Sequence, residues 1–314
     1  MSSNQYSVGV DLGGTNVRVA LLNELGDIIT ILKEPTEASL GPEHVISKIK
    51  GMIEKVAGTH HIVGIGIGSP GPLNPFIGVV MDPPNLPGWS NVPIRSILQD
   101  VFSVPVFVDN DANVAGLAEA IKGAGKGYSS VVYITWSTGI GAGIVLNGRI
   151  LQGATGNAGE IGNMIIVPYG KKQSNLNGGA LEAVASGTAI GLLGKELLGP
   201  AVSRAEDVFQ LASEGNESAK QMVNQAVNYM AIGISNLAHT LNPSVFVLGG
   251  GVMNASPLLL DELTILVKGY LYESMQDSLL IKKAELGDQA GIVGAGFLPF
   301  GDKGTGPLSL SNPY

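Results

Sequence analysis

The first thirty-five residues carry an alternation of apolar and polar positions that is typical of β-strands. Two apolar runs, rich in β-branched side chains, flank the segment DLGGTN, Asp11–Asn16, within residues 8–23. This pattern predicts a β-hairpin whose turn is built from glycine and small polar residues. The apolar positions of residues 28–35 follow a Glu24–Asp27 turn signal and predict a third antiparallel strand.

A second strand, glycine turn and strand follow at residues 130–150. Here the turn TGIGAG, Thr138–Gly143, precedes a returning apolar run and a further Asn147–Gly148 turn. A third glycine-rich loop, Gly249–Gly251, follows the strand-like segment that begins at Ser244. We therefore expect three separate glycine loops, each at the end of a strand.

Apolar residues also recur at helical spacing in two longer segments. In residues 43–58 the predicted buried face consists of Val45, Ile46, Ile49, Met52, Ile53 and Val56. In residues 217–241 it consists of Ala219, Met222, Val223, Ala226, Met230, Ile234, Leu237 and Leu241. Shorter helices are predicted over 93–102, 258–270 and 290–298, and strands within 62–74 and over 104–108. Mixed helices and strands of this kind predict an α/β chain.

The segment IVGIGIGSPGPLN, residues 62–74, contains the spacing of a dinucleotide-binding fingerprint. Gly66, Gly68 and Gly71 match it, but Pro70 and Pro72 exclude the helix that must begin there to receive a pyrophosphate. We interpret Gly68–Gly71 as a loop on the substrate side. The proline-rich segment 79–92 reads as a connecting loop with one polar candidate, Asn85.

Charged and amide side chains end the predicted strand at 104–108. The segment DNDAN, residues 109–113, lies at the carboxyl end of this strand, where α/β proteins bind their ligands. At the start of the next helix, Asp111 would stay ionised near the positive end of the helix dipole and could accept a hydroxyl proton. The alternative role for these aspartates is helix capping, and we expect Asp109 to serve as the cap.

Two more acidic residues, Glu160 and Glu182, follow the second hairpin. Glu160 and Asn163 lie in a glycine-rich loop, which suits hydrogen bonding to two neighbouring sugar hydroxyls. Glu182 lies in the first turn of a predicted helix, where it also complements the helix dipole.

The first glycine turn has the chemistry of a phosphate-binding loop. Gly13 and Gly14 lack a Cβ, so their N–H groups can converge on an anion, while Thr15 and Asn16 add neutral donors. Asp11 could face a water bound to a metal ion. The turn therefore suits a nucleotide polyphosphate with Mg²⁺, although an ordinary hairpin turn has the same composition.

Composition narrows the class of protein. The chain has 314 residues, enough for two α/β domains, with 45% hydrophobic and 14% charged residues. A net charge of -8 disfavours non-specific nucleic-acid binding, and zero cysteines exclude disulfides, thiolate-bound zinc and a cysteine nucleophile. The N-terminal MSSNQYS has neither a basic nor an apolar region, so no signal peptide is expected, and no apolar run approaches the roughly 20 residues that span a bilayer. A cytoplasmic enzyme with no membrane partner is expected.

Seven motifs together resemble the ROK family of bacterial sugar kinases and repressors, most closely its glucokinases. They are DLGGTN, GSPGP, NLPGW, DNDAN, STGIGAGIVLNG, GNAGEIGNM and GGALEAVASG, in this order over nearly the whole chain. The glycine loops also resemble the phosphate and adenosine motifs of the sugar kinase, actin and heat-shock ATPase superfamily. The resemblance implies a two-lobed, actin-like or hexokinase-type (ribonuclease H-like) fold, with a small domain of residues 1–113 plus 298–314 and a large domain of residues 114–297.

The resemblance also implies ATP-dependent phosphorylation of a hexose, with glucose favoured. Asp111 would be the catalytic base, and the sugar would be bound by Asn85, Asn110, Asp111, Glu160, Asn163 and Glu182. ATP would be bound by Asp11, Gly13, Gly14, Thr15, Asn16, Thr138, Gly139, Gly250 and Gly251, with Asp11 near Mg²⁺. Relatives are usually homodimers or homotetramers.

One motif departs from the family. Typical members bind a structural zinc through a histidine and three cysteines, but this chain has Asn163 at the histidine position and YGKKQSNLNGGALE, with Ala180 at the last thiolate position, in place of the cysteine segment. We expect no zinc. Because the family histidine would bind the sugar at its 2-position, the sequence leaves open which sugars are selected at that position. Kinases that use polyphosphate, kinases of other hexoses or N-acetylhexosamines, and sugar-sensing regulators remain alternatives. The Gly-, Pro- and Ser-rich segment 300–314 is expected to be loosely held.

Overall fold

The computed structural model describes residues 5–256 and 258–301, which fall into two compact units. Unit 1 comprises residues 1–129, 143–158 and 288–314, and unit 2 comprises residues 130–142 and 159–287. The predicted domain boundaries after residue 113 and before residue 298 are not those of the units and stay a prediction. Most of the segment expected to be loosely held, residues 302–314, lies outside the described residues.

Unit 1 is built on a five-stranded sheet of order β3-β2-β1-β4-β7. Its strands are β1 (Tyr6–Leu12), β2 (Asn16–Asn23), β3 (Ile28–Pro35), β4 (Ile62–Ser69) and β7 (Val106–Asn110). Strands β1, β2 and β3 are antiparallel neighbours, whereas β4 and β7 continue the sheet parallel to β1. The predicted hairpin and third strand are therefore confirmed.

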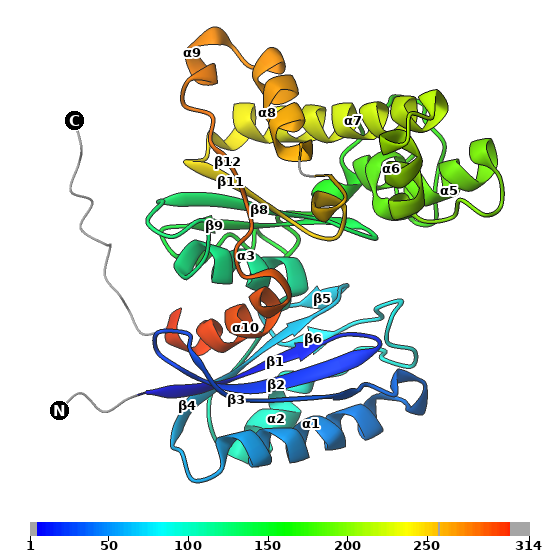
Figure 1. Cartoon of the computed structure of the whole chain (residues 1–314). Helices are drawn as coiled ribbons and strands as arrows, with labels where there is room; N and C mark the ends of the chain where they lie inside the picture. Colours follow the sequence, from blue (N-terminus) through cyan, green and yellow to red (C-terminus); the bar gives the residue numbers. More distant parts are fainter. Residues whose placement is uncertain (1–4, 257, 302–314) are drawn as a thin grey trace. The chain divides into compact units, whose positions relative to one another are not determined.

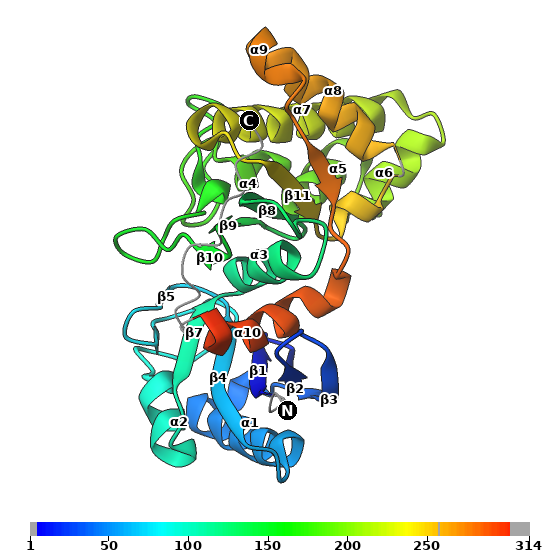
Figure 2. The same cartoon turned by 90° about the vertical axis from the view of Figure 1, so that its left-hand side faces the viewer.

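Helices cover both faces of this sheet (Figures 1 and 2). The helices of unit 1 are α1 (Pro42–Ala57), α2 (Ile94–Phe102), α3 (Asp111–Ile121) and α10 (Ala290–Gly301). Short elements complete the unit: η1 (Ala38–Leu40), β5 (Leu73–Asn74), β6 (Val79–Val80) and β10 (Arg149–Ile150), with η4 (Gly287–Gln289) at the return from unit 2. Helices α1 and α2 lie on one face, and α10 lies with α3 on the other. All six residues of the predicted apolar face of α1 are buried, and they pack with the inward side chains of the sheet in one core.

Helix α10 approaches the sheet at glycine positions. A Cβ built on Gly66 of β4 would lie 1.8 Å from the carbonyl oxygen of Ala295, and one on Gly294 would lie 1.7 Å from that of Val114 in α3. A Cβ on Gly68 would also meet the Val114 side chain, at 2.7 Å. No helix begins after β4. Two of the three fingerprint glycines are therefore needed for close packing of helices, which confirms that this is not a dinucleotide-binding motif.

A second five-stranded sheet has the order β10-β9-β8-β11-β12. Strands β8, β11 and β12 belong to unit 2, whereas β10 belongs to unit 1. Besides β10, the strands of this sheet are β8 (Ser130–Trp136), β9 (Ile140–Leu146), β11 (Val245–Gly249) and β12 (Ile281–Lys283), and β9 continues from unit 2 into unit 1 at residue 143. Strands β8, β11 and β12 are parallel. The glycine turn is shorter than predicted, because β9 already begins at Ile140 and takes in Gly141 and Gly143. The predicted turn between β9 and β10 is confirmed, with positive φ angles of 50° at Asn147 and 74° at Gly148.

Helices make up most of unit 2. They are η2 (Ile161–Asn163), α4 (Leu181–Ala185), α5 (Gly187–Leu198), α6 (Ala205–Ser213), α7 (Glu217–Leu241), η3 (Val252–Asn254), α8 (Leu259–Tyr270) and α9 (Glu273–Gln276). The predicted stripe of α7 is buried except for Leu241, which is half-buried at the last turn, and α7 packs against α4, α5, α6 and α8. Helix α6 and strand β12 were not predicted. Within the described residues, no helix combines the length and apolar character needed to cross a bilayer.

Candidate functional site

The parallel strands of unit 1 end at one edge of the sheet and carry polar residues there. Asp11 of β1 is in register with Gly68 of β4, which is in register with Asp109 of β7. The next residue pair along, Ser69 and Asn110, is also in register. The carboxyl ends of the three strands therefore bring the first glycine turn, the loop after β4 and the DNDAN segment to the same edge, as predicted.

The glycine turn after β1 is held closely by its neighbours. The N–H of Gly13 donates to the carbonyl of Asn16 at 3.0 Å, and the buried Thr36 hydroxyl donates to the carbonyl of Gly13 at 2.6 Å. A Cβ on Gly14 would lie 2.6 Å from the carbonyl oxygen of Asn85. Only glycine allows this approach, so Gly14 and the candidate sugar ligand Asn85 are neighbours, and Thr15 is exposed beside them.

Asn85 lies in a loop that is anchored by its neighbours in the chain. Leu86 and Trp89 are fully buried in the core of unit 1, whereas Asn85 is exposed. The short strand β6 occupies the start of this segment and pairs with β5. The segment is thus more ordered than the connecting loop predicted from its prolines.

Asp11 is engaged by an arginine. The Arg18 Nε donates to Asp11 Oδ2 at 2.8 Å, Arg18 Nη2 donates to the same oxygen, and Arg18 Nη1 donates to the carbonyl of Asp288 at 2.5 Å. The carboxylate also lies beside the N-terminal turn of α10, where a Cβ on Gly291 would be 3.2 Å from Asp11 Oδ1. The Asp11 carboxylate is thus held between a guanidinium and a helix N-terminus.

The junction between β7 and α3 places Asp111 at the first position of the helix. Asn110 is the N-cap, and its Oδ1 accepts the N–H of Ala112 at 2.9 Å. The expectation that Asp109 caps the helix is therefore wrong, because Asp109 is still within the strand and its side chain is buried. Asp111 is exposed, and its Oδ1 accepts the same Ala112 N–H at 2.7 Å. The structure therefore places the Asp111 carboxylate at the exposed first position of α3, and its role as the base stays a prediction.

Asp109 is instead the centre of a buried hydrogen-bond network. Its Oδ1 accepts the N–H of Asn110 and the Nδ2 of Asn113, both at 2.8 Å, and its Oδ2 accepts the Nε2 of Gln152 at 2.7 Å. Burial raises the pKa of this carboxyl, and the hydrogen bonds to Asn113 and Gln152 oppose the rise. Asp109 thereby ties α3 to the segment that follows β10.

In unit 2 the two candidate glutamates belong to neighbouring elements. Glu182 in α4 accepts the N–H of Ile140 at 2.7 Å, and a Cβ on Gly139 would lie 2.6 Å from the same carboxylate oxygen. Burial and then the negative charge of Glu182 raise the pKa of Glu160. These contacts bring Glu160, Glu182 and the second glycine turn together.

Asn163 ends the same short turn as Glu160. Its N–H donates to the carbonyl of Glu160 at 3.3 Å, and its side-chain Oδ1 accepts the N–H of Asn177 at 2.7 Å. The Nδ2 of Asn177 donates in return to the carbonyl of Asn163 at 3.3 Å. Asn163 itself is exposed.

A pocket of about 360 Å³ opens where the glycine loops of unit 2 meet two helices. Its lining is Ser137, Thr138, Gly187, Thr188, Leu192, Ser203, Arg204, Ala205, Glu206, Gly251 and Val252. The N–H of Gly187 and that of Thr188, at the start of α5, donate to the carbonyls of Ser137 and Thr138 at 2.8 and 3.2 Å. Gly250 adjoins Trp136, because its Cβ would lie 2.3 Å from that residue's carbonyl oxygen.

Sequence reasoning identified Thr138 and Gly251 in this pocket but missed the α5 and α6 residues. The sequence feature that indicates the start of α5 is Ser186, whose hydroxyl caps the helix by accepting the N–H of Ala189 at 3.1 Å. That cap divides the single helix predicted after Glu182 into α4 and α5. The N–H groups of Gly187, Thr188, Ala189 and Ile190 in the first turn of α5 already donate to other groups of the protein, so they are not available to a phosphate.

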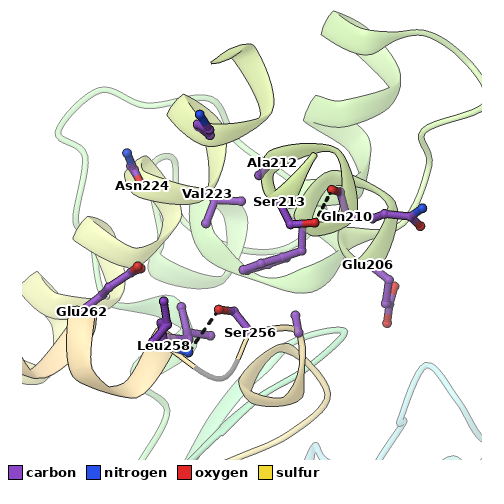
Figure 3. A pocket seen from close by; sticks show the side chains of 13 residues that line it. Glu206, Gln210, Ala212, Ser213, Val223, Asn224, Ser256, Leu258 and Glu262 are labelled. Carbon is purple, nitrogen blue, oxygen red and sulfur yellow. Dashed lines mark hydrogen bonds between the residues drawn. The ribbon is translucent and has the colours of Figure 1, made fainter. Parts of the chain in front are cut away.

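Unit 2 has a larger pocket, of about 740 Å³, between α6, α7 and α8 (Figure 3). Phe209, Val223 and Leu259 supply apolar surface, and Gln210 and Asn224 are among its polar residues. None of the predicted site residues lines it. Glu206 lines both pockets, so the larger pocket adjoins the smaller one.

The predicted residues thus gather within each unit. Asp11, Gly13, Gly14, Thr15, Asn16, Asn85, Asn110 and Asp111 belong to the strand ends and loops of unit 1, and Thr138, Gly139, Glu160, Asn163, Glu182, Gly250 and Gly251 belong to those of unit 2. In the part of the chain that the structure describes, no group of three or more histidine, aspartate and glutamate side chains is arranged to hold a metal ion.

Comparison with known proteins connects this arrangement to one family. The ROK family model matches residues 7–299. A glucokinase of Halalkalibacterium halodurans is 36% identical, over 94% of this chain and 95% of the relative. The chain is also similar to two solved structures. A ROK hexokinase from Thermus thermophilus has a TM-score of 0.86 and 35% identity, covering 93% of this chain and 97% of that one.

The second structure is a ROK family glucokinase from Streptomyces griseus in complex with glucose and AMPPNP. It has a TM-score of 0.76 and 28% identity, covering 93% of this chain and 98% of that one. These neighbours confirm the actin-like, hexokinase-type fold class predicted from the glycine motifs.

Proposed function

Because the chain belongs to the ROK family, we propose that it is an ATP-dependent sugar kinase that phosphorylates glucose to glucose 6-phosphate. The observation that carries this proposal is the match to glucokinases along nearly the full length of both chains. It is supported by the acidic and amide residues that each unit brings together at its strand ends.

In this reaction Asp111 is the catalytic base. As the 6-hydroxyl oxygen of glucose attacks the γ-phosphorus of ATP, a new O–P bond forms and the bond to the ADP oxygen breaks. The hydroxyl proton passes to the Asp111 carboxylate. Such general-base assistance contributes about 10²–10⁴ in rate, while alignment of the reactants contributes more. The exposed position of Asp111 on the first turn of α3 supports this role.

The remaining sugar ligands provide complementary hydrogen bonds. We propose that Asn85 and Asn110 in unit 1 bind sugar hydroxyls, and that Glu160, Asn163 and Glu182 in unit 2 do so as well. Carboxylates accept from hydroxyls, and amides both donate and accept. A site with several such partners rejects analogues that lack a hydroxyl, because a polar group is then left unpaired.

The smaller pocket of unit 2 fits the nucleoside of ATP. Its apolar Leu192 and Val252 suit a base, and the hydroxyl of Thr138 in the second glycine turn suits a phosphate oxygen. Arg204 is the one cation in its lining, where Glu206 is also present. A polyphosphate chain would need a longer basic groove, so the pocket supports ATP as the phosphoryl donor.

Mg²⁺ is expected to accompany ATP. Asp11 offers a hard oxygen ligand, and its engagement by Arg18 suits contact with a water on the ion better than direct coordination. When bound, the ion would neutralise charge on the transferring phosphate groups. No metal ligands replace the missing zinc motif around Asn163 within the described residues, and the absence of zinc stays a prediction.

A coupled assay decides between the substrates. Glucose, mannose, N-acetylglucosamine and fructose should each be tested with ATP and with polyphosphate. We expect the highest kcat/KM for glucose with ATP. Turnover with polyphosphate but not with ATP would identify polyphosphate as the phosphoryl donor. Sugar binding without activity for any of the pairs would favour a sugar sensor.

We also propose a cytoplasmic location, which use of ATP and glucose favours, and a homodimeric or homotetrameric assembly as in related kinases. Light scattering coupled to size-exclusion chromatography would test the assembly.

A further inference from the structure

The loop between η2 and α4 is closed by its own hydrogen bonds. Residues 164–180 leave from Asn163 and return beside it, since Leu181 donates its N–H to the carbonyl of Met164 at 2.8 Å. Ile166 and Val167 both donate their N–H groups to the carbonyl of Gly179, at 2.9 and 3.1 Å. The two ends of the loop therefore form a paired stem that places Asn177 next to Asn163.

Asn177 holds Asn163 by two reciprocal bonds. Its N–H donates to Asn163 Oδ1 at 2.7 Å, and its Nδ2 donates to the Asn163 carbonyl at 3.3 Å. If the Asn163 amide turned over, its NH₂ group would face the Asn177 N–H, which is also a donor. That orientation loses a bond and places two donors together. The amide of Asn163 is therefore fixed with its oxygen inward, toward Asn177, and its NH₂ group outward, away from Asn177.

The outward group of Asn163 is then the NH₂, which can only donate. The i to i+3 bond from Asn163 to the Glu160 carbonyl brings these two residues to the same side of the short turn. A Cβ built on Gly162, the residue before Asn163, would lie 3.3 Å from a carboxylate oxygen of Glu182. A donor thus stands beside two carboxylate acceptors.

We propose that Asn177 is a positioning residue that fixes Asn163 as a hydrogen-bond donor to one sugar hydroxyl. That hydroxyl in turn donates a hydrogen bond to a neighbouring carboxylate. A hydroxyl has one proton to give and lone pairs to accept. A sugar hydroxyl between Asn163 and Glu160 is therefore bound in one direction only. This inference rests on the proposed sugar kinase activity and adds Asn177, which has no predicted contact with the sugar.

The test uses the full-length enzyme with glucose and its 1-, 2-, 3- and 4-deoxy analogues. The N–H that fixes the Asn163 amide belongs to the Asn177 backbone and is kept in every variant, so the substitutions act on the side-chain bond that holds this N–H in place. Asn177→Ala removes that bond, and Asn177→Asp removes it without changing the size of the side chain. Asn163→Asp keeps the inward oxygen but replaces the outward donor with an acceptor. Asn175→Ala, an exposed asparagine of the same loop, is the matched control.

We expect both Asn177 variants to raise KM for glucose roughly three- to tenfold, as for one weakened hydrogen bond, with kcat within about twofold. Asn163→Asp should raise KM further. For one deoxy analogue, the one that lacks the hydroxyl facing Asn163, wild type and the Asn177 variants should have the same KM. Asn175→Ala should match wild type for every sugar, and thermal denaturation should show that all variants are folded.

A uniform loss by the Asn177 variants with glucose and all four analogues would assign Asn177 a purely structural role and overturn the inference. Unchanged KM values would also overturn it. If the wild type itself neither phosphorylates nor binds glucose in a titration monitored by calorimetry, the proposed function fails and this inference fails with it. The wild-type measurement therefore separates the two failures.

Discussion

The buried network around Asp109 allows a stability prediction with a worked magnitude. Asp109 is 1% exposed and receives hydrogen bonds from the side chains of Asn113 and Gln152. Asn113 is 2% exposed, and its Oδ1 already has no hydrogen-bond partner. Asp109→Ala would leave the whole Asn113 amide unsatisfied in the core, which is among the costly consequences of a substitution.

Two hydrogen bonds to a charged group contribute about 1.5–3 kcal/mol each. Relief from burying the carboxylate, which is the cause of its raised pKa, offsets part of this loss. We expect Asp109→Ala to lower the free energy of unfolding by about 2–4 kcal/mol, or Tm by roughly 5–15 °C for domains of this size. In Asp109→Asn the Gln152 amide can turn to offer its oxygen to the new NH₂ group. The expected loss is then only about 1 kcal/mol.

Differential scanning calorimetry of wild type, both Asp109 variants and the exposed control Asp100→Ala would measure these effects. The pKa of Asp109 is raised in the folded state, so ionisation penalises folding above the unfolded pKa of about 4. Relative to wild type, Asp109→Asn should therefore gain stability as pH rises from 4 to 8. Equal melting of the Ala and Asn variants, or the opposite pH trend, would refute this account of the network.

Three further predictions concern other parts of the chain. Asp111→Ala should keep glucose binding in a calorimetric titration but lower kcat at least about a hundredfold; near-normal turnover would remove Asp111 from the chemistry. Gly66→Ala should destabilise the protein by about 1–3 kcal/mol or more in denaturant unfolding, because its Cβ would lie 1.8 Å from a backbone oxygen. The control Gly51→Ala, which has open space in α1, should be neutral or stabilising. Glu160→Gln should raise Tm without sugar increasingly as pH rises above the unfolded glutamate pKa, since burial and Glu182 penalise its charge; a Tm difference that shrinks with pH would contradict this.

Much of the architecture was predictable because it follows local periodicity. The apolar face of α1 and the β1–β2 hairpin were derived from spacing and turn composition alone, and both are confirmed. The elements that were missed are short or weakly patterned. Strand β12 has three residues and is part of the sheet through its pairing with β11, which no local signal reveals.

The site was predictable as a set of residue types but not as a set of partners. Charged and amide residues after a buried strand indicated the DNDAN segment, yet Asp109 was taken for the cap because capping preference does not distinguish Asp from Asn. The decisive fact is that β7 runs on to Asn110, so Asp109 points into the core and meets Gln152, 43 residues away. The same limit applies to Arg18, whose contact with the Asp288 carbonyl spans 270 residues.

The glycines of β4 show how a sequence signal can be separated from its usual meaning. Gly66 and Gly68 have the spacing of a phosphate-binding fingerprint, but a fingerprint needs a helix N-terminus immediately after the strand, and Pro70 prevents one. What the glycines allow here is close approach of α10 and α3 to the sheet. Substitution at Gly66 should therefore reduce the free energy of unfolding while leaving KM for ATP unchanged in the folded fraction. An altered KM for ATP with unchanged stability would instead return this segment to nucleotide binding.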